Sequence, residues 1–162
     1  MEQSVIEQVL GILTLEKVEF QVSDNKRSFL VHLGSAAVTI EFGSWGDGTV
    51  VSIRSTLLEQ IDASGERRQR IFDELNELNR QRYFTKLYCD LERSFIIVEY
   101  DLLGSQLTGP GFLNGLSAVA SAADELVDSL SLSLGTGVRA ADALSATDPV
   151  SGEGAAGPVV SA

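Results

Sequence analysis

Apolar residues recur every three to four positions in three segments of the chain, which predicts three amphipathic helices. The first segment carries its apolar face on Val5, Ile6, Val9, Leu10 and Leu13. The second helix is expected to begin at Ser64 or Gly65 and to bury Ile71, Leu75 and Leu78. Proline fits the first turn of a helix, so the third is expected to open at Pro110, with an apolar stripe from Phe112 to Leu130.

Between these helices, apolar and polar residues alternate with a period of two, which predicts β-strands. The alternation places three sets of residues on one face of a sheet: Val18, Phe20 and Val22; Phe29, Val31 and Leu33; Val38, Ile40 and Phe42. Residues 50–54, 85–91 and 94–100 give further strands, and the glycine-rich segment 43–48 is expected to be a loop or a hairpin connection. Because short polar loops join successive strands, we expect an antiparallel meander. The fold class is therefore α+β, in the order helix, strand meander, helix, two strands, helix.

The composition changes after residue 134. Residues 135–162 are rich in Ala, Gly and Ser, include Pro149 and Pro158, and contain no aromatic residue. Such a segment buries too little apolar surface to offset its loss of conformational entropy. The sequence therefore predicts an α+β domain over residues 1–134 and a disordered tail over residues 135–162.

Charge and cysteine content narrow the possible partners and the cellular location. The formal net charge is -11, which disfavours binding to nucleic acid and to anionic membrane surfaces. No apolar run is long enough to cross a membrane, and the N-terminus lacks the basic residues of a secretion signal. Cys89 is the only cysteine, which fits a reducing compartment and predicts a cytoplasmic location.

Four short segments resemble the bacterial YbjN family, whose fold is similar to that of type III secretion chaperones. They are LNELN (Leu75 to Asn79), the nearby Phe84, FIIVEYDLL (Phe95 to Leu103) and ADELVDSL (Ala123 to Leu130). The resemblance covers roughly residues 1–134. It implies a non-enzymatic, often dimeric, protein-binding domain, and some members are described as sensory transduction regulators.

The sequence offers no catalytic or metal-binding motif, so we expect neither an enzyme nor a bound cofactor. His32 is the only histidine and has no cysteine or carboxylate cluster at ligand spacing. Cys89 alternates with polar neighbours and is expected to face the core, where a thiol is usually inert.

Seven residues are candidates for a binding interface. Asn76 and Asn79 lie three residues apart near a helix end, where asparagine more often supplies a left-handed cap or bonds loose backbone groups than binds a peptide. Trp45 lies between glycines, either tucked against the sheet or exposed as an interface anchor. A basic cluster contributes Arg67, Arg70, Arg80 and Arg82. The cluster is either a solvated helix face or a docking surface for an acidic segment.

The leading hypothesis is a chaperone-like or regulatory domain that binds a protein or peptide and acts as a homodimer. An extended or amphipathic peptide would lie on its sheet or in an apolar groove. The alternative is a sensory domain that binds a small ligand between the sheet and the last helix.

Overall fold

The computed structural model describes residues 2–24 and 26–140 of the chain. Its helices are α1 (Glu2–Leu15), α2 (Gly65–Arg80) and α3 (Gly109–Leu134), with a short 3-10 helix η1 (Gly104–Gln106) before α3. The strands are β1 (Phe20–Val22), β2 (Ser28–Leu33), β3 (Ala36–Trp45), β4 (Gly48–Glu59), β5 (Lys86–Asp90), β6 (Phe95–Leu103) and β7 (Val138–Arg139).

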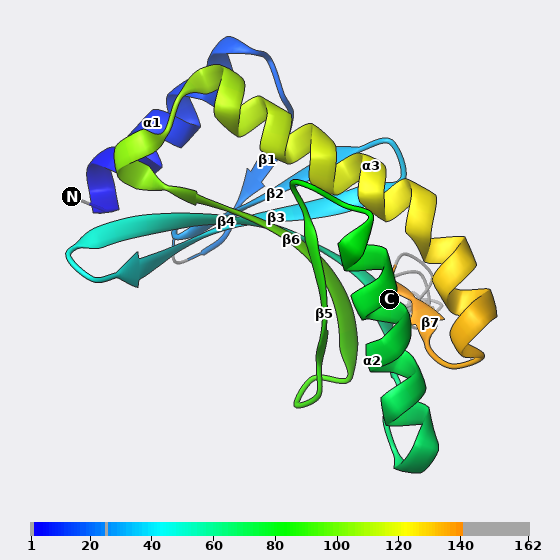
Figure 1. Cartoon of the computed structure of the whole chain (residues 1–162). Helices are drawn as coiled ribbons and strands as arrows, with labels where there is room; N and C mark the ends of the chain where they lie inside the picture. Colours follow the sequence, from blue (N-terminus) through cyan, green and yellow to red (C-terminus); the bar gives the residue numbers. More distant parts are fainter. Residues whose placement is uncertain (1, 25, 141–162) are drawn as a thin grey trace, which may run out of the picture.

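The strands form one antiparallel sheet in the order β1-β2-β3-β4-β6-β5, with β7 attached to β4. Helices α1 and α3 lie on the same side of this sheet, and α2 runs beside β5 (Figure 1). The core lies between α1, α3 and the sheet, and its fully buried side chains include Val9, Ile40, Ile53 and Phe112. The predicted α+β class and the antiparallel meander are confirmed.

The helices follow the apolar periodicity, with one difference at the N-terminus. In α1 the side chains of Val5, Ile6, Val9 and Leu13 are buried, whereas Leu10 is exposed. Helix α3 begins at a side-chain cap, since Oγ1 of Thr108 accepts a hydrogen bond from the backbone N–H of Gly111. It ends at Gly135 in the left-handed conformation that glycine adopts without steric cost.

One strand prediction is wrong in detail. Val22 does not bury its side chain as the alternation predicts, because β1 is a short strand at the edge of the sheet. The segment 43–48 is the hairpin connection between β3 and β4, one of the two predicted alternatives. Gly43 to Trp45 continue β3 and pair with β4, so the turn is confined to residues 46–47.

Helix α2 begins at the predicted place, and the side chain of the residue before it does not cap the helix. Ser64 occupies the N-cap position, but its hydroxyl donates to a carboxylate oxygen of Asp62 at 2.6 Å. The helix ends at Gln81 in the right-handed conformation, and the N–H of Gln81 bonds the carbonyls of Leu78 and Asn79. No asparagine supplies a left-handed cap at this end; Asn79 instead bonds backbone groups of Leu87, which is the other structural role predicted for it.

The ordered chain continues past the predicted domain end at residue 134. Residues 135–140 turn back from α3 and form β7 against the end of β4. The rest of the segment predicted to be disordered, residues 141–162, lies outside the described residues.

Candidate protein-binding surfaces

The edge of the sheet formed by β5 is closed by a side chain of α2. Nδ2 of Asn79 donates to the carbonyl oxygen of Leu87 at 2.9 Å, and Oδ1 of Asn79 accepts from the N–H of Leu87 at 2.7 Å. A neighbouring antiparallel strand would make the same pair of bonds with Leu87. Asn79 therefore stands in for a strand, and β5 cannot accept an added strand at this position.

The opposite edge, formed by β1, is open. β1 pairs with β2 on one side, and no strand within residues 2–24 and 26–140 pairs with its other side. The N–H of Ser23 donates to the carbonyl of Ser28 at 3.0 Å. Because ladder bonds alternate along an antiparallel strand, the backbone groups of Phe20 and Val22 face outward. The apolar side chain of Val22 lies beside these groups and is 47% exposed.

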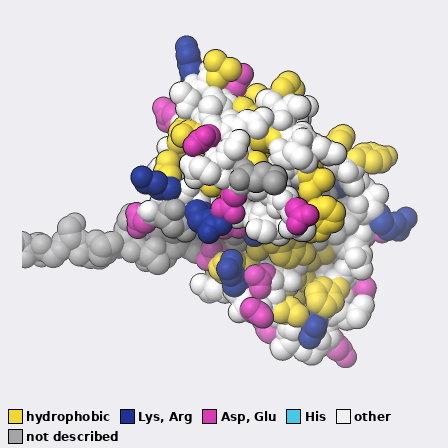
Figure 2. All heavy atoms as spheres, turned by 90° about the vertical axis from the view of Figure 1, so that its left-hand side faces the viewer, with side chains coloured by type: hydrophobic (Ala, Val, Ile, Leu, Met, Phe, Trp, Pro, Cys, Tyr) yellow, Lys and Arg dark blue, Asp and Glu magenta, His cyan; other side chains and the backbone are white. Residues whose placement is uncertain are grey.

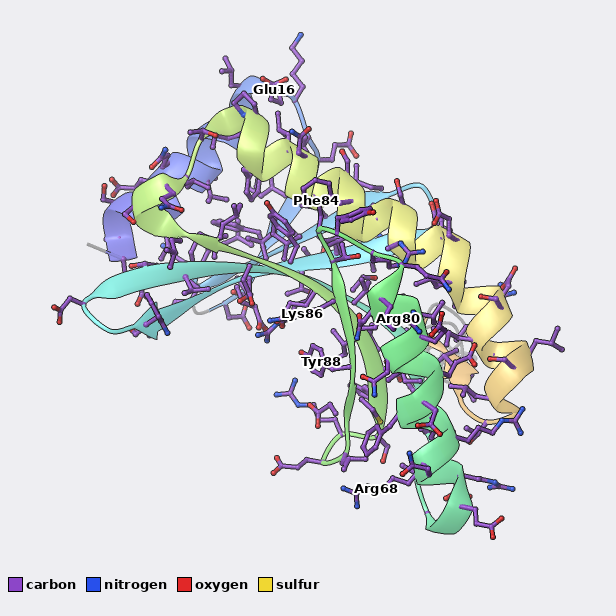
Figure 3. The ribbon with its side chains drawn as sticks, in the orientation of Figure 1. Glu16, Arg68, Arg80, Phe84, Lys86 and Tyr88 are labelled. Atoms are coloured by element: carbon purple, nitrogen blue, oxygen red, sulfur yellow. The ribbon has the colours of Figure 1, made fainter. Side chains whose placement is uncertain are left out.

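A polar network crosses the sheet face that points away from α1 and α3. The carboxylate of Glu99, whose side chain is only 5% exposed, pairs with Arg54 and with Nζ of Lys86 at 2.8 Å. The hydroxyl of Tyr88 donates to the same carboxylate at 3.1 Å. Lys86 and Tyr88 project from β5 away from α2 (Figure 3). Burial opposes the charge of Arg54, but the carboxylates of Glu99 and Glu41 outweigh it and raise the pKa of Arg54.

The network extends along β6 to Asp101. One carboxylate oxygen of Asp101 accepts from the hydroxyl of Ser52 at 2.6 Å, and the other pairs with Lys86 at 2.7 Å. The hydrogen bonds that Lys86 donates to Asp101 and Glu99 raise the pKa of Lys86. These matched charges hold β4, β5 and β6 in register and leave no unpaired cation in the network to attract a ligand.

The seven predicted interface residues do not form one surface. Trp45 lies at the end of the β3–β4 hairpin with 69% of its surface exposed, which favours the exposed alternative over the tucked one. That hairpin end and α2 lie at opposite ends of the sheet (Figure 1). Asn76 is exposed on α2, whereas the side-chain amide of Asn79 is already hydrogen-bonded to the backbone of Leu87. The role of these residues in binding stays a prediction.

The arginines of the predicted basic cluster have partners within the chain. Arg67 pairs with Asp62, Arg80 with Glu77, Arg82 with Glu125, and Arg70 donates to the carbonyl of Ser133. These contacts favour the solvated, intramolecular interpretation of the cluster. Acidic, basic and hydrophobic side chains are interspersed on the face shown in Figure 2.

Sequence reasoning missed an exposed aromatic pair between α2 and β5. Tyr83 is 96% exposed and Phe84 is 74% exposed. Phe84 borders a groove of about 370 Å³ against small residues of α3, among them Gly115 and Ala118. No apolar periodicity marks this five-residue connection, so only the two adjacent aromatic residues in a predicted break could have indicated the exposed pair.

The described residues contain no group of histidine, cysteine and carboxylate side chains that could hold a metal ion. His32 is exposed on β2, as the alternation predicts. Cys89 is half-buried against the core, and its burial, together with Asp90, raises the pKa of the thiol. A raised pKa reduces the thiolate fraction, which does not suit a nucleophile. Within the part of the chain that the structure describes, no helix is long and apolar enough to cross a membrane.

The sequence profile of a family described as "T3SS (YopN, CesT) and YbjN peptide-binding chaperone 1" matches residues 2–142. A search of curated proteins finds no match. Among solved structures, the ExsC-ExsE complex contains a chain that superposes with a TM-score of 0.58 at 17% identity, covering 79% of this chain and 94% of that one. The HopA1-SchA chaperone-effector complex gives 0.57 at 9% identity, covering 79% and 98%. The Yersinia pestis type III secretion chaperone SycH, in complex with a fragment of YscM2, gives 0.50 at 13% identity, covering 78% and 99%.

Proposed function

Because the chain belongs to the family of T3SS and YbjN peptide-binding chaperones, we propose that it binds an extended segment of a protein partner and catalyses no reaction. Two of the solved structures of similar fold are complexes of a chaperone with a partner protein or protein fragment, which supports a protein partner here. Across the described part of the chain, no group of histidine, cysteine and carboxylate side chains could hold a metal ion.

The open β1 edge is the observation that carries the proposed site. An exposed strand edge pairs readily with an extended peptide, and proteins commonly block edges that must stay free. This chain blocks the β5 edge through Asn79 and leaves the outward groups of β1 unpaired by any described strand. The partner segment would add a strand beside Phe20 and Val22. The net charge of -11 favours a neutral or basic segment over an acidic one.

Proline in place of Val22 tests this site. Val22→Pro removes an N–H that faces outward and is not needed for pairing with β2, so the domain should remain folded. Val22→Thr is the matched control, because it keeps the N–H and the branched shape. Peptides selected from a displayed library on the wild-type protein serve as ligands, and fluorescence anisotropy gives their affinities.

We expect Val22→Pro to weaken the selected peptides by about tenfold or more, since it removes one backbone hydrogen bond and blocks close approach of the strand. Val22→Thr should bind like the wild type. Equal affinities for all three proteins would rule out β1 as the peptide site. Failure of the wild-type protein to select any peptide would count against the proposed function itself.

The domain is also proposed to act as a homodimer. The sheet face that carries Glu99 and Lys86 points away from the helices, and Trp45 stands exposed at the end of a projecting hairpin. Both are surfaces that a second copy can cover. Light scattering at micromolar concentration tests the proposal, and a mass equal to one chain at every concentration would refute it.

One observation favours the small-ligand alternative. A hollow of about 290 Å³ lies between the sheet and α3, at the lower end of the range for ligand pockets. A thermal-shift screen against a metabolite panel separates the two functions, because a bound ligand raises the melting temperature by mass action. A reproducible rise with one compound and no peptide selection would favour the small ligand.

A further inference from the structure

The side chain of Trp45 lies on the same face of the sheet as the polar network. Alternate residues of β3, from Ala36 to Phe42, are buried against the helices. The register of β3 with β4 is continuous from Thr39 to Trp45. The odd-numbered residues of β3, up to and including Trp45, therefore point to the opposite face. We call this the outer face, because it turns away from α1 and α3.

The outer face also carries a pocket farther along β3, away from the hairpin end. Its volume of about 250 Å³ lies below the roughly 300–1,000 Å³ of small-molecule pockets, so it suits a single inserted side chain better than a drug-sized ligand. Trp45 is six residues from Thr39, or about 20 Å along the strand, so the chain's own tryptophan does not fill this outer pocket. The residues that line the outer pocket include Thr39, Arg54, Tyr88, Arg93, Phe95 and Ile97.

The outer pocket has the chemistry that an indole ring requires. Guanidinium groups attract the face of a tryptophan ring, and the indole N–H needs one hydrogen-bond acceptor. The pocket supplies the guanidinium of Arg54 and that of Arg93, which is 70% exposed and pairs with Asp90 at a long 3.8 Å. A guanidinium that is paired through its N–H groups can still stack through its planar face. The carboxylates of Glu41 and Asp90 line the same pocket and can accept the indole N–H.

The balance of charge on the outer face favours a second copy of the chain as the partner. Two copies, each with a net charge of -11, repel one another. The outer pocket and the adjoining network bring together three cations and four carboxylates, which are Arg54, Lys86 and Arg93, and Glu41, Asp90, Glu99 and Asp101. This region is nearly neutral, so the repulsion between two copies is small where their outer faces meet.

We propose that Trp45 of each copy inserts into the outer pocket of a second copy, in a dimer with two-fold symmetry. The inference rests on the proposed homodimer and adds the surface that receives Trp45. A two-fold interface requires a self-complementary face, and here the projecting ring and the pocket lie on one face of the same chain. Gly43 lies between them on β3, where a Cβ would meet no atom within 4 Å. A glycine at this position lets the second copy approach closely between the two sites.

The fluorescence of the full chain tests the inference, because Trp45 is the only tryptophan. Emission spectra over a dilution series report whether the ring is in water, and sedimentation equilibrium over the same range gives the dissociation constant of the dimer. Two variants alter the outer pocket and leave Trp45 in place. Thr39→Phe fills the pocket with a residue that suits a strand, and Arg93→Ala removes a guanidinium.

Arg80→Ala is the matched control for Arg93→Ala. Both arginines are exposed, and each pairs with a carboxylate three residues earlier in the chain. Arg80 lies on α2 and does not line the outer pocket. Circular dichroism establishes that each variant is folded.

We expect the emission of the wild-type chain to shift to shorter wavelength as its concentration rises through the dissociation constant, because the ring leaves water. Thr39→Phe and Arg93→Ala should each weaken dimerisation by about tenfold or more, since every contact occurs twice in a two-fold dimer. Both should also abolish the shift at concentrations where the wild type is dimeric. Arg80→Ala should behave like the wild type.

Three results would overturn the inference, and they separate it from the proposed homodimer. A dimer whose emission does not change with concentration, or whose dissociation constant is unaffected by the two pocket variants, would overturn the inference and leave the homodimer standing. A chain that stays monomeric throughout would refute both. Weaker binding of the selected peptides by Thr39→Phe, with an unchanged dimer, would assign the outer pocket to the partner segment instead of a second copy.

Discussion

Asn79 of α2 makes two backbone hydrogen bonds with Leu87 of β5, at 2.9 Å and 2.7 Å, and so occupies the position of a neighbouring strand. The contact joins the second helix to the edge of the sheet across the exposed connection that contains Tyr83 and Phe84. It also distinguishes the two edges of the sheet, because the β1 edge has no comparable contact among the described residues.

Replacing Asn79 tests the strength of this contact. Asn79→Ala leaves the N–H and C=O of Leu87, a residue that is 4% exposed, without a partner. We expect the free energy of unfolding to fall by about 2 kcal/mol. Asn76→Ala removes the same side chain from an exposed position of the same helix and should change stability by less than about 0.5 kcal/mol. Urea titration measures both, and equal small effects would contradict the structural role of Asn79.

Glu99 is expected to contribute more than any other member of the polar network. Glu99→Gln removes a nearly buried negative charge that pairs with Arg54 and Lys86. The free energy of unfolding should fall by about 2–3 kcal/mol. The loss is limited because both cations keep some contact with water. Glu41→Gln alters a partner of Arg54 whose side chain is 46% exposed and should cost less than about 1 kcal/mol. Chemical denaturation at pH 7 compares the two variants. A cost for Glu99→Gln no larger than that for Glu41→Gln would contradict this ranking.

Asp101 makes stability depend on pH at the acid end. Burial opposes its charge, but hydrogen bonds from Lys86 and Ser52 outweigh this and hold the pKa of Asp101 below its ordinary value of 3.8. A lowered pKa in the folded state means that this stabilisation is present above pH 3.8 and is lost as the pH falls through the folded value. Asp101→Asn should therefore flatten the decline in stability below pH 3.8. Asp47→Asn, at the exposed hairpin turn, should keep the wild-type decline in thermal melts, and an unchanged decline in Asp101→Asn would refute the assignment.

Two glycines within helices should respond in opposite directions to alanine. A Cβ at Gly115 would lie 2.5 Å from a ring carbon of Tyr100, so Gly115→Ala should cost about 1–3 kcal/mol through overpacking. A Cβ at Gly11 meets nothing within 4 Å, so Gly11→Ala should stabilise α1 by about 0.5–1 kcal/mol. Thermal denaturation reports both signs. Effects of the same sign would show that helix propensity, rather than the contact with Tyr100, decides the outcome.

The sequence alone predicts those features that depend on local periodicity. The helical stripe of Val5, Val9 and Leu13 and the alternation of Val38, Ile40 and Phe42 both emerge as buried, because each pattern has one apolar face to bury. Val22 and Leu10 fit the same patterns and are exposed, since burial also requires a neighbouring element to cover them. Periodicity does not reveal which elements become neighbours.

The candidate site was harder to predict because its features come from pairings between elements. The asparagine at position 79 is recognisable as a backbone-binding residue near a helix end, but its partner Leu87 lies in the following strand. The arginines form a visible run of charge, and the pair of Arg80 with Glu77 lies within one helix, but the carboxylate partner of Arg82, Glu125, comes from a different helix. The open β1 edge follows only from the order of strands in the sheet.

Trp45 is the residue through which the proposed homodimer can be tested directly. Its side chain is 69% exposed at the end of the β3–β4 hairpin, and its backbone pairs with Gly48. Trp45→Ala should leave the stability of the isolated chain within about 0.5 kcal/mol, because it removes little buried surface. If Trp45 anchors the dimer, the same change should weaken association by about 2 kcal/mol, which is roughly thirtyfold in the dissociation constant. Tyr83→Ala, which removes an even more exposed aromatic side chain at a distance from the hairpin, should leave association unchanged. Sedimentation equilibrium measures all three proteins, and the same dissociation constant for Trp45→Ala and the wild type would exclude the hairpin end from the interface.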